Sequence, residues 1–427
     1  MPMNDWKTVY RNLNPKEPLA ANDPRLERAL YTNEFFQHVK DELELNSHTN
    51  FKLLISGHTG CGKSTFLNLV AADPEVSGRF HLVKYSVKEL LDVNDVDYVD
   101  LLLSIAAQAV TSMDESRLKA IAPLLEKAES LARQMQGIIE VKREKAETAV
   151  GALGGETNLG IGFFDFLKSS FFARFRFEDK VRKITRETYR TRITELLSLI
   201  DGILLELRGQ LGKPLLILID DTDKIPPEVG LKLFYDNGHH LAAPQANIVY
   251  LIDLSIATSP KFAAIRGKFG AESFFPAIKV VNKAGGEDET ARNNCAILSE
   301  LVRLRVPPEI MEDDTVQRAI CYFGGVVREL VRILQYAVFE AKGKAMRIHV
   351  DAARHRIANE FNLFGRHTRI LKAILADPDW LAKATDEEKL DETLLDLLHM
   401  PALFQYRNGD IKWYRPYPVF TDWLRTL

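Results

Sequence analysis

The feature that most constrains this chain is a short glycine-rich loop between an apolar run and a helical pattern. Residues 51–66 read FKLLISGHTGCGKSTF, which contains the spacing G-x-x-x-x-G-K-S. Gly57, Gly60 and Gly62 let the backbone bend so that several N–H groups point at one anion. A helix that begins near Lys63 would add the positive end of its dipole. This order of strand, loop and helix predicts an α/β fold with a phosphate site at the loop.

The side chains after the glycines match the chemistry of a nucleoside triphosphate. Lys63 is placed to reach the β- and γ-phosphates, and the Ser64 hydroxyl is placed to ligate Mg²⁺. A chance glycine loop is the alternative, and the order of the elements argues against it. We therefore predict that the nucleotide is bound by the whole loop and the start of the helix, which comprise Gly57, His58, Thr59, Gly60, Cys61, Gly62, Lys63, Ser64 and Thr65.

A second apolar run ends in acids. Residues 214–224 read PLLILIDDTDK, which is typical of a strand buried on both faces of a parallel sheet. We predict that Asp220 holds Mg²⁺, directly or through water, and that Asp221 orients the water that attacks the γ-phosphate. An acidic turn after a core strand is the alternative. We favour the metal site because the chain already carries a phosphate loop.

Two further strands are expected at residues 79–86 (RFHLVKYS) and 247–254 (NIVYLIDL). Because strands and helices alternate, the pattern favours a parallel α/β sheet with the site at the carboxyl ends of its strands. Asp253 and Ser255 lie at the end of the last run and are candidates for sensing phosphate.

Composition narrows the class of protein. A length of 427 residues suggests two or three domains, and a net charge of −3 gives no global electrostatic case for nucleic acid. The three cysteines show no metal-ligand spacing, which favours reduced thiols. The N-terminus lacks a signal pattern, and no apolar run approaches the ~18 residues of a membrane helix. We therefore expect a cytoplasmic protein without a transmembrane segment.

Together these patterns resemble the AAA+ ATPases, and among them the bacterial STAND-type and replication-origin-type members. Residues 262–276 (FAAIRGKFGAESFFP) are similar to the family segment whose arginine reaches the γ-phosphate of a neighbouring subunit. Residues 323–334 (FGGVVRELVRIL) are similar to the sensor-2 signature GG-x-x-R-x-L. The resemblance implies that Arg266 acts in trans and that Arg328 reaches the phosphates from a mobile lid. The predicted catalytic residues are Asp221, Lys63, Arg266 and Arg328.

The residues also support a lid arginine directly, because Gly324-Gly325 breaks one helical pattern and Arg328 stands in the first turn of the next. A solvated arginine is the alternative at Arg328, and an ordinary polar-loop arginine is the alternative at Arg266. The resemblance also implies that the region of residues 23–25 lies against adenine, so that ATP with Mg²⁺ is the expected ligand. Many family members carry Glu where this chain has Asp221, and the shorter carboxylate suggests slow hydrolysis.

A long insertion is expected at about 88–212. It begins with a charged amphipathic helix at 113–148, continues through a Gly/Phe-rich stretch at 149–177, and becomes helical again at 178–207. The Phe-rich stretch is interpreted either as core or as an exposed apolar tip that docks a partner. Residues 174–192 carry eight Lys or Arg and three Asp or Glu. They are a possible nucleic-acid contact, although a solvated helix face is favoured.

The C-terminal part reads as helices followed by two strands around an Asn-Gly turn, which resembles a winged helix. Its expected recognition helix, 386–400, contains six acids and one lysine. Placing it against DNA phosphates would cost electrostatic energy, so protein–protein contact is favoured over groove readout.

We therefore predict an α/β, parallel-sheet P-loop NTPase core with a long helical insertion (1–285), a helical lid domain (286–363) and a winged-helix-like domain (364–427). The predicted function is an ATPase whose nucleotide state switches homo-oligomeric assembly or controls a partner in another chain. The resemblance adds a setting in antiphage defence or mobile elements. A DNA-binding loader or initiator and a nucleotide-binding scaffold without turnover are the alternatives.

Overall fold

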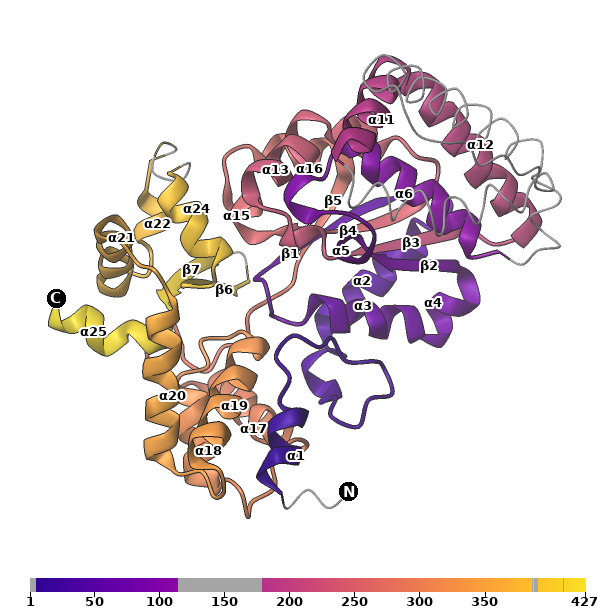
Figure 1. Cartoon of the computed structure of the whole chain (residues 1–427). Coiled ribbons are helices and arrows are strands. Elements are labelled where there is room, and N and C mark those ends of the chain that lie inside the picture. Colours follow the sequence, from indigo (N-terminus) through magenta and orange to yellow (C-terminus); the bar gives the residue numbers. More distant parts are fainter. Residues whose placement is uncertain (1–4, 114–178, 386, 388–390, 410) are drawn as a thin grey trace, which may run out of the picture.

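The computed structural model describes residues 5–113, 179–385, 387, 391–409 and 411–427 (Figure 1). The predicted helix beyond residue 113, the Gly/Phe-rich stretch at 149–177 and the first part of the basic segment lie outside these residues. Their roles therefore stay predictions.

The core is a parallel sheet of five strands in the order β2-β3-β4-β1-β5. The strands are β1 (Lys52–Gly57), β2 (His81–Ser86), β3 (Leu215–Asp220), β4 (Asn247–Asp253) and β5 (Gly270–Phe274). Because parallel strands end at one edge, β1, β3 and β4 bring the glycine loop, the acids and Asp253 to the same place. The predicted parallel α/β core is confirmed.

Both faces of the sheet are covered by helices (Figure 1). Leu53 and Ile55 of β1 belong to one hydrophobic core, and Leu54, between them, belongs to the other. All residues of β1, β3 and β4 are buried, as the unbroken apolar runs predict. The first face packs against α2 (Glu34–Leu45), α3 (Lys63–Ala72) and α4 (Pro74–Arg79). The second packs against α6 (Tyr98–Thr111), α11 (Asp179–Thr191), α12 (Ile193–Leu211) and the short helices α5 (Val87–Leu90), α13 (Pro227–Leu231), α14 (Gly238–Ala242), α15 (Leu254–Thr258) and α16 (Phe262–Phe269).

The fifth strand was not among the predicted strands. Residues 270–274 belong to the segment predicted to contain the trans arginine, and in the structure they form β5 beside β1. The strand is short, starts at a glycine and is exposed or half-buried over its first three residues. An edge strand of this kind lacks the apolar run that identifies a central strand.

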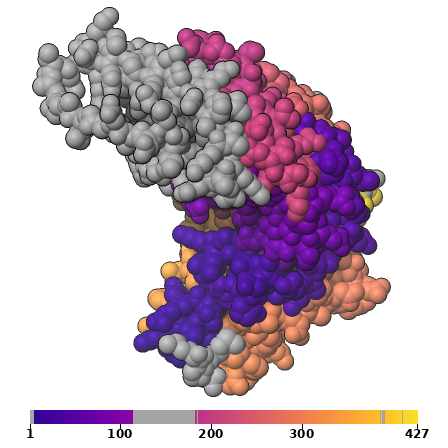
Figure 2. All heavy atoms as spheres, turned by 90° about the vertical axis from the view of Figure 1, so that its right-hand side faces the viewer, coloured from indigo at the N-terminus to yellow at the C-terminus, as the bar shows by residue number. Residues whose placement is uncertain are grey.

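A second part of the chain is helical and forms the lid. It contains α17 (Glu289–Arg303), α18 (Asp313–Cys321), α19 (Val327–Ala341) and α20 (Arg347–Glu360). Leu330, Val331 and Leu334 of α19 are buried, as the predicted apolar face requires. The N-terminal helix α1 (Trp6–Asn12) packs on α19 through Tyr10 and Phe339. In the space-filling view, the indigo N-terminal residues accordingly border the orange lid (Figure 2).

The C-terminal part has the predicted winged-helix-like form. Helices α21 (Gly365–Ala376), α22 (Trp380–Lys383) and α24 (Glu392–His399) precede an antiparallel hairpin of β6 (Leu403–Asn408) and β7 (Ile411–Pro416), and α25 (Thr421–Thr426) follows it. The acidic helix α24 packs next to α15 of the core and buries Leu394, Leu397 and Leu398. Part of the expected recognition helix therefore lies against the protein itself.

The described part of the basic segment forms α11, whose arginines pair with acids before and within α6. Arg182 Nε is 3.1 Å from Asp95 Oδ2, and Arg190 Nη2 is 2.7 Å from Asp97 Oδ2. Arg186 Nη2 is 2.6 Å from the buried Oδ2 of Asp100. These charges hold the insertion to the core, which reduces what they can offer to nucleic acid. No helix among the described residues is long and apolar enough to span a membrane.

Candidate functional site

The glycine loop adopts the conformation that its sequence predicts. It joins β1 to α3, which begins at Lys63. Gly60 and Gly62 have φ values of 89° and 109°, in the region that favours glycine. A Cβ on Gly62 would stand 2.6 Å from Tyr31 Oη, and a Cβ on Gly60 would overlap the Arg328 guanidinium. Both glycines are therefore required by the backbone and by close neighbours.

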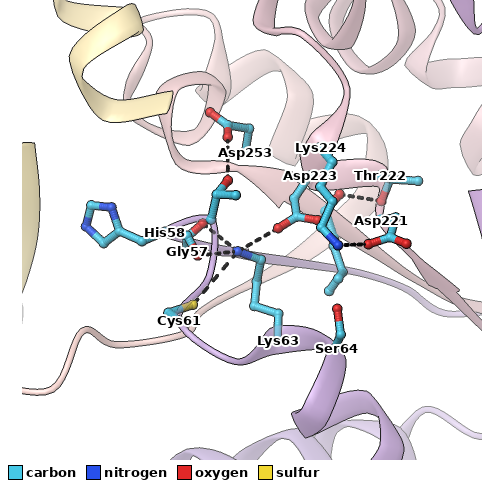
Figure 3. A network of polar contacts seen from close by, with 12 residues as sticks. Gly57, His58, Cys61, Lys63, Ser64, Asp221, Thr222, Asp223, Lys224 and Asp253 are labelled. Carbon is cyan, nitrogen blue, oxygen red and sulfur yellow. Dashed lines mark hydrogen bonds and ion pairs between the residues drawn. The ribbon is translucent and has the colours of Figure 1, made fainter. Parts of the chain in front are cut away.

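Lys63 is held by a carboxylate that the sequence analysis did not single out. Its Nζ is 2.8 Å from Asp223 Oδ2, and both side chains are buried. The same Nζ donates to the carbonyl oxygens of Gly57 and His58, each at 2.7 Å. Burial alone would lower the pKa of Lys63, but the charge and hydrogen bond of Asp223, together with the nearby Cys61 and Asp253, outweigh burial and raise that pKa. Figure 3 shows the ammonium group between Asp223 and the loop carbonyls.

Asp223 follows the paired acids in a short 3₁₀ turn, η4 (Thr222–Lys224). The turn is tied to the neighbouring strand because Thr222 Oγ1 donates to the carbonyl oxygen of Leu251 at 2.5 Å. Within the described chain, Oδ1 of Asp223 is buried without a hydrogen-bond partner. The spacing D-D-x-D was the available sequence signal for this residue.

The predicted Mg²⁺ ligands lie together. Ser64 Oγ donates to Asp220 Oδ1 at 2.8 Å, although the two residues are 156 positions apart. Burial raises the pKa of Asp220, and the neighbouring charge of Asp221 raises it further. Lys84 Nζ of β2 lies 3.9 Å from the other carboxylate oxygen. A hydroxyl and a carboxylate are the hard oxygen donors that Mg²⁺ prefers, so these residues fit the ion.

The carboxylate of Asp221 is engaged by two neighbouring side chains in this structure. Asp221 has a φ of 65°, its Oδ2 accepts a hydrogen bond from Ser86 Oγ at 2.5 Å, and its Oδ1 pairs with Lys224. Figure 3 shows its carboxylate joined to the ammonium group of Lys224. Asp223 is the acid that faces the loop lysine in this structure, and the role of Asp221 stays a prediction.

Arg328 lies where the resemblance expects a lid arginine. Its backbone N–H donates to the carbonyl oxygen of Gly60 at 3.1 Å, and its guanidinium lies against the Cα of Gly60. Arg266 is instead exposed on α16 and lines a separate hollow with Lys412 of β7. The structure thus brings Lys63, Ser64, Asp220 and Arg328 together and leaves Arg266 outside this chain's own site. Action in trans stays a prediction.

The C-terminal part also contacts the loop, which the sequence analysis missed. The fully buried His58 ring points away from Lys63, and its Nε2 accepts the backbone N–H of Gln405 in β6 at 2.7 Å. His399 Nδ1 is 3.0 Å from Asp253 Oδ2, and Thr59 Oγ1 donates to the same oxygen at 3.4 Å. Asp253, expected at a phosphate-sensing position, therefore joins the loop to α24. The side chain of His58 is a domain contact, and only its backbone remains available to a phosphate.

A cavity of about 310 Å³ extends from the loop toward the lid and the N-terminal segment. Lys63, Ser64 and Asp223 line one part, and Leu19, Val327 and Val331 provide apolar lining. Arg25, from the region expected near adenine, lines it too but is fully engaged, because it pairs with both Asp23 and Glu17. The cavity therefore offers polar groups for phosphates and an apolar wall for a base.

Neither a protein-family model nor a curated protein matches this chain. Among solved structures, Cdc6p of Pyrobaculum aerophilum aligns at 11% identity and a TM-score of 0.37 over 97% of this chain and 98% of that one. Orc1 of Aeropyrum pernix, solved in complex with DNA, aligns at 12% identity and a TM-score of 0.41 over 98% of each chain. A RuvB variant of Thermotoga maritima aligns at 12% identity and a TM-score of 0.34 over 91% and 94%.

Because the identities and TM-scores of these alignments are low, the fold of this chain is described from its own strand order and helices. The described chain has a parallel sheet with the phosphate loop after β1, the paired acids after the nearby β3, a helical lid that contacts the loop and a winged-helix-like end. This is the arrangement that the sequence resemblance to the AAA+ ATPases predicts.

Proposed function

We propose that this chain binds ATP with Mg²⁺, hydrolyses it slowly, and uses the nucleotide state to switch assembly or to control a partner protein. The observation that carries the proposal is the phosphate loop, on which all three parts of the chain meet. Arg328 of the lid contacts Gly60, and Gln405 of the C-terminal hairpin contacts His58. A phosphate that enters this loop would meet groups whose positions depend on both neighbouring parts.

Different residues of this chain would bind the phosphates, hold Mg²⁺ and orient the attacking water. The loop N–H groups and Lys63 bind the phosphates, while Ser64 and Asp220 would hold Mg²⁺. When bound, Mg²⁺ neutralises charge on the phosphate oxygens. Arg328 of the lid places a second cation at the loop. A carboxylate orients the attacking water, and Asp221 is the predicted residue once it leaves Lys224.

The DNA-binding loader has less support from the described residues. Three arginines of α11 are paired with acids, and α24 is packed against α15. Protein control is therefore the preferred reading. The trans role of Arg266, the homo-oligomer and the defence or mobile-element setting remain predictions from the resemblance.

The test is Mg²⁺-dependent phosphate release from ATP by wild type and K63A, over a range of protein concentrations, with and without duplex DNA. We expect a slow rate that rises more than linearly with concentration, is indifferent to DNA and disappears in K63A. A rate that appears only with DNA and falls steeply with salt would favour the loader. ATP binding without turnover would favour the scaffold, and no ATP binding would refute the proposal.

A further inference from the structure

A buried arginine outside every predicted role faces the nucleotide cavity. Arg305 follows α17 at the start of the lid, is 5% exposed and lines the cavity that contains the phosphate loop. Its Nη1 donates to the carbonyl oxygen of Leu301 at 2.9 Å. Among the described residues, no carboxylate forms an ion pair with it. Within the described chain, its other side-chain N–H groups have no hydrogen-bond acceptor.

A guanidinium in this position is costly for the empty protein. Burial lowers the pKa of Arg305 to about 10, so the group stays charged at neutral pH. A buried charge without an ion partner destabilises a fold. Arg25 lines the same cavity, and its charge is balanced by ion pairs with two carboxylates. The contrast indicates that the partner of Arg305 is a ligand.

The neighbours of Arg305 indicate which part of the cavity it faces. The charged and polar groups that act on it most strongly are Tyr31, Arg25, Asp23 and Glu17, all from the N-terminal segment. Lys63 with Asp223, and Ser64 with Asp220, form a separate cluster at the carboxyl ends of β1 and β3, which we call the lysine cluster. The apolar wall of Leu19, Val327 and Val331 lines the same cavity. The lysine cluster would hold the triphosphate, which leaves the N-terminal wall to the rest of the nucleotide.

We propose that Arg305 is a nucleotide-binding residue that donates hydrogen bonds to the nucleoside moiety of ATP. The inference rests on the proposed function, since it assigns the second end of the same ligand. A guanidinium has donors only, so it recognises acceptors such as ring nitrogens or ribose oxygens. Because it comes from the lid, this contact would also join the lid to the base end of the nucleotide, as Arg328 joins it to the phosphate loop.

Equilibrium calorimetry with two probes, ATP and inorganic tripolyphosphate, tests the assignment. We expect R305M to weaken ATP binding roughly tenfold to a hundredfold, the scale of hydrogen bonds to a charged group, and to leave tripolyphosphate binding unchanged. R305K should lie between wild type and R305M. K63A should weaken both probes. R292M removes an exposed arginine of α17, the helix that precedes Arg305, and is the matched control, for which neither affinity should change.

Thermal unfolding adds a readout that a purely structural arginine would not give. Removing an unpaired buried charge should leave the Tm of the empty R305M protein unchanged or higher, while the increase in Tm caused by ATP becomes smaller. Equal loss of ATP and tripolyphosphate affinity in R305M would overturn the nucleoside assignment. Unchanged ATP affinity, with or without a lower Tm, would overturn the proposal. Wild-type protein that binds neither probe would refute the proposed function itself.

Discussion

At the scale of single residues, the phosphate-loop lysine carries an internal counter-ion. The Lys63–Asp223 pair is almost completely excluded from water, and two loop carbonyls complete the ammonium's hydrogen bonds. Strong charge-assisted contacts of this kind hold a lysine in one place. An incoming phosphate must therefore share or displace Asp223, so this acid opposes nucleotide binding while it stabilises the empty loop.

The variant D223N separates these two effects. We expect the empty protein to lose about 3 kcal/mol of unfolding free energy, because the lysine keeps its burial and loses its counter-ion. ATP should bind about tenfold more tightly, because nothing negative competes for Lys63. Calorimetry and thermal unfolding measure both quantities.

D221N is the matched comparison for that experiment. It changes a neighbouring acid that pairs with Lys224 and leaves Lys63 paired. It should bind ATP as wild type does and lose phosphate release, if Asp221 orients the attacking water. Weaker ATP binding by D223N than by wild type would contradict the counter-ion role, and full turnover by D221N would contradict the predicted role of Asp221.

A second residue-scale prediction concerns how His58 makes the unfolding free energy depend on pH. Burial, with the charge of Lys63, lowers the pKa of His58 from 6.5 to about 3. Between these pH values the unfolded chain binds a proton that the folded chain does not, so unfolding free energy falls as the pH falls. His58 should contribute a slope of about 1.4 kcal/mol per pH unit at most. Urea unfolding at pH 7, 6 and 5 should show a shallower slope in H58N, and equal slopes would refute this assignment.

At the scale of elements, α11 and the segment leading into α6 are joined by ion pairs of unequal burial. The Asp100 side chain is 1% exposed, whereas the Arg190 side chain at the rim is 49% exposed. Burial raises the pKa of Asp100 to about 6 despite the opposing contact with Arg186. The pair at Asp100 therefore fixes the described end of the insertion far more firmly than the pair at Asp97 does.

Two arginine variants of the same helix should show this difference. R186M leaves a buried carboxylate without its partner, and we expect a loss of about 3–5 kcal/mol in unfolding free energy. R190M removes a rim pair and should cost less than about 1 kcal/mol. Urea titrations of the two proteins make the comparison directly. Equal losses would mean that burial does not control the strength of these contacts.

Sequence patterns predicted the central elements better than the peripheral ones. The unbroken apolar runs of β1, β3 and β4 identified strands because those strands are buried on both faces. The edge strand β5 lacked that signal. The basic pattern of α11 predicted a charged surface. It could not show that the arginines would form ion pairs with acids nearly 90 residues earlier in the chain.

At the scale of the whole molecule, the C-terminal part is coupled to the phosphate loop by a titratable pair. Burial alone would lower the pKa of His399, but its contact with Asp253 raises that pKa above the usual 6.5. A histidine with a raised pKa contributes stability that is complete below the unfolded value and lost as the pH rises through the folded value. The contact between α24 and the core should therefore weaken above neutral pH.

Limited proteolysis at pH 6 and pH 8.5 measures this contact. We expect cleavage around the C-terminal part, residues 364–427, to become severalfold faster at the higher pH in wild type. In H399N the contact should be weak at both values and the pH dependence should be lost. H38N, at an exposed position on α2, controls for general effects of losing a histidine. If the cleavage rate of the wild type is the same at both pH values, the His399–Asp253 pair does not control the contact between α24 and the core.

The sequence by itself determined which chemical groups this protein places at its candidate site, because each local pattern is complete within a short span. The loop from Gly57 to Ser64, the acids after β3 and the Gly-Gly-x-x-Arg segment each contain their own geometry and charge. Tertiary structure decided which partners those groups have. The Lys63–Asp223 pair, the contact of His58 with Gln405 and the isolation of Arg305 depend on packing between distant segments. Burial makes such contacts strong, and no local pattern in a sequence specifies which distant residue will complete them.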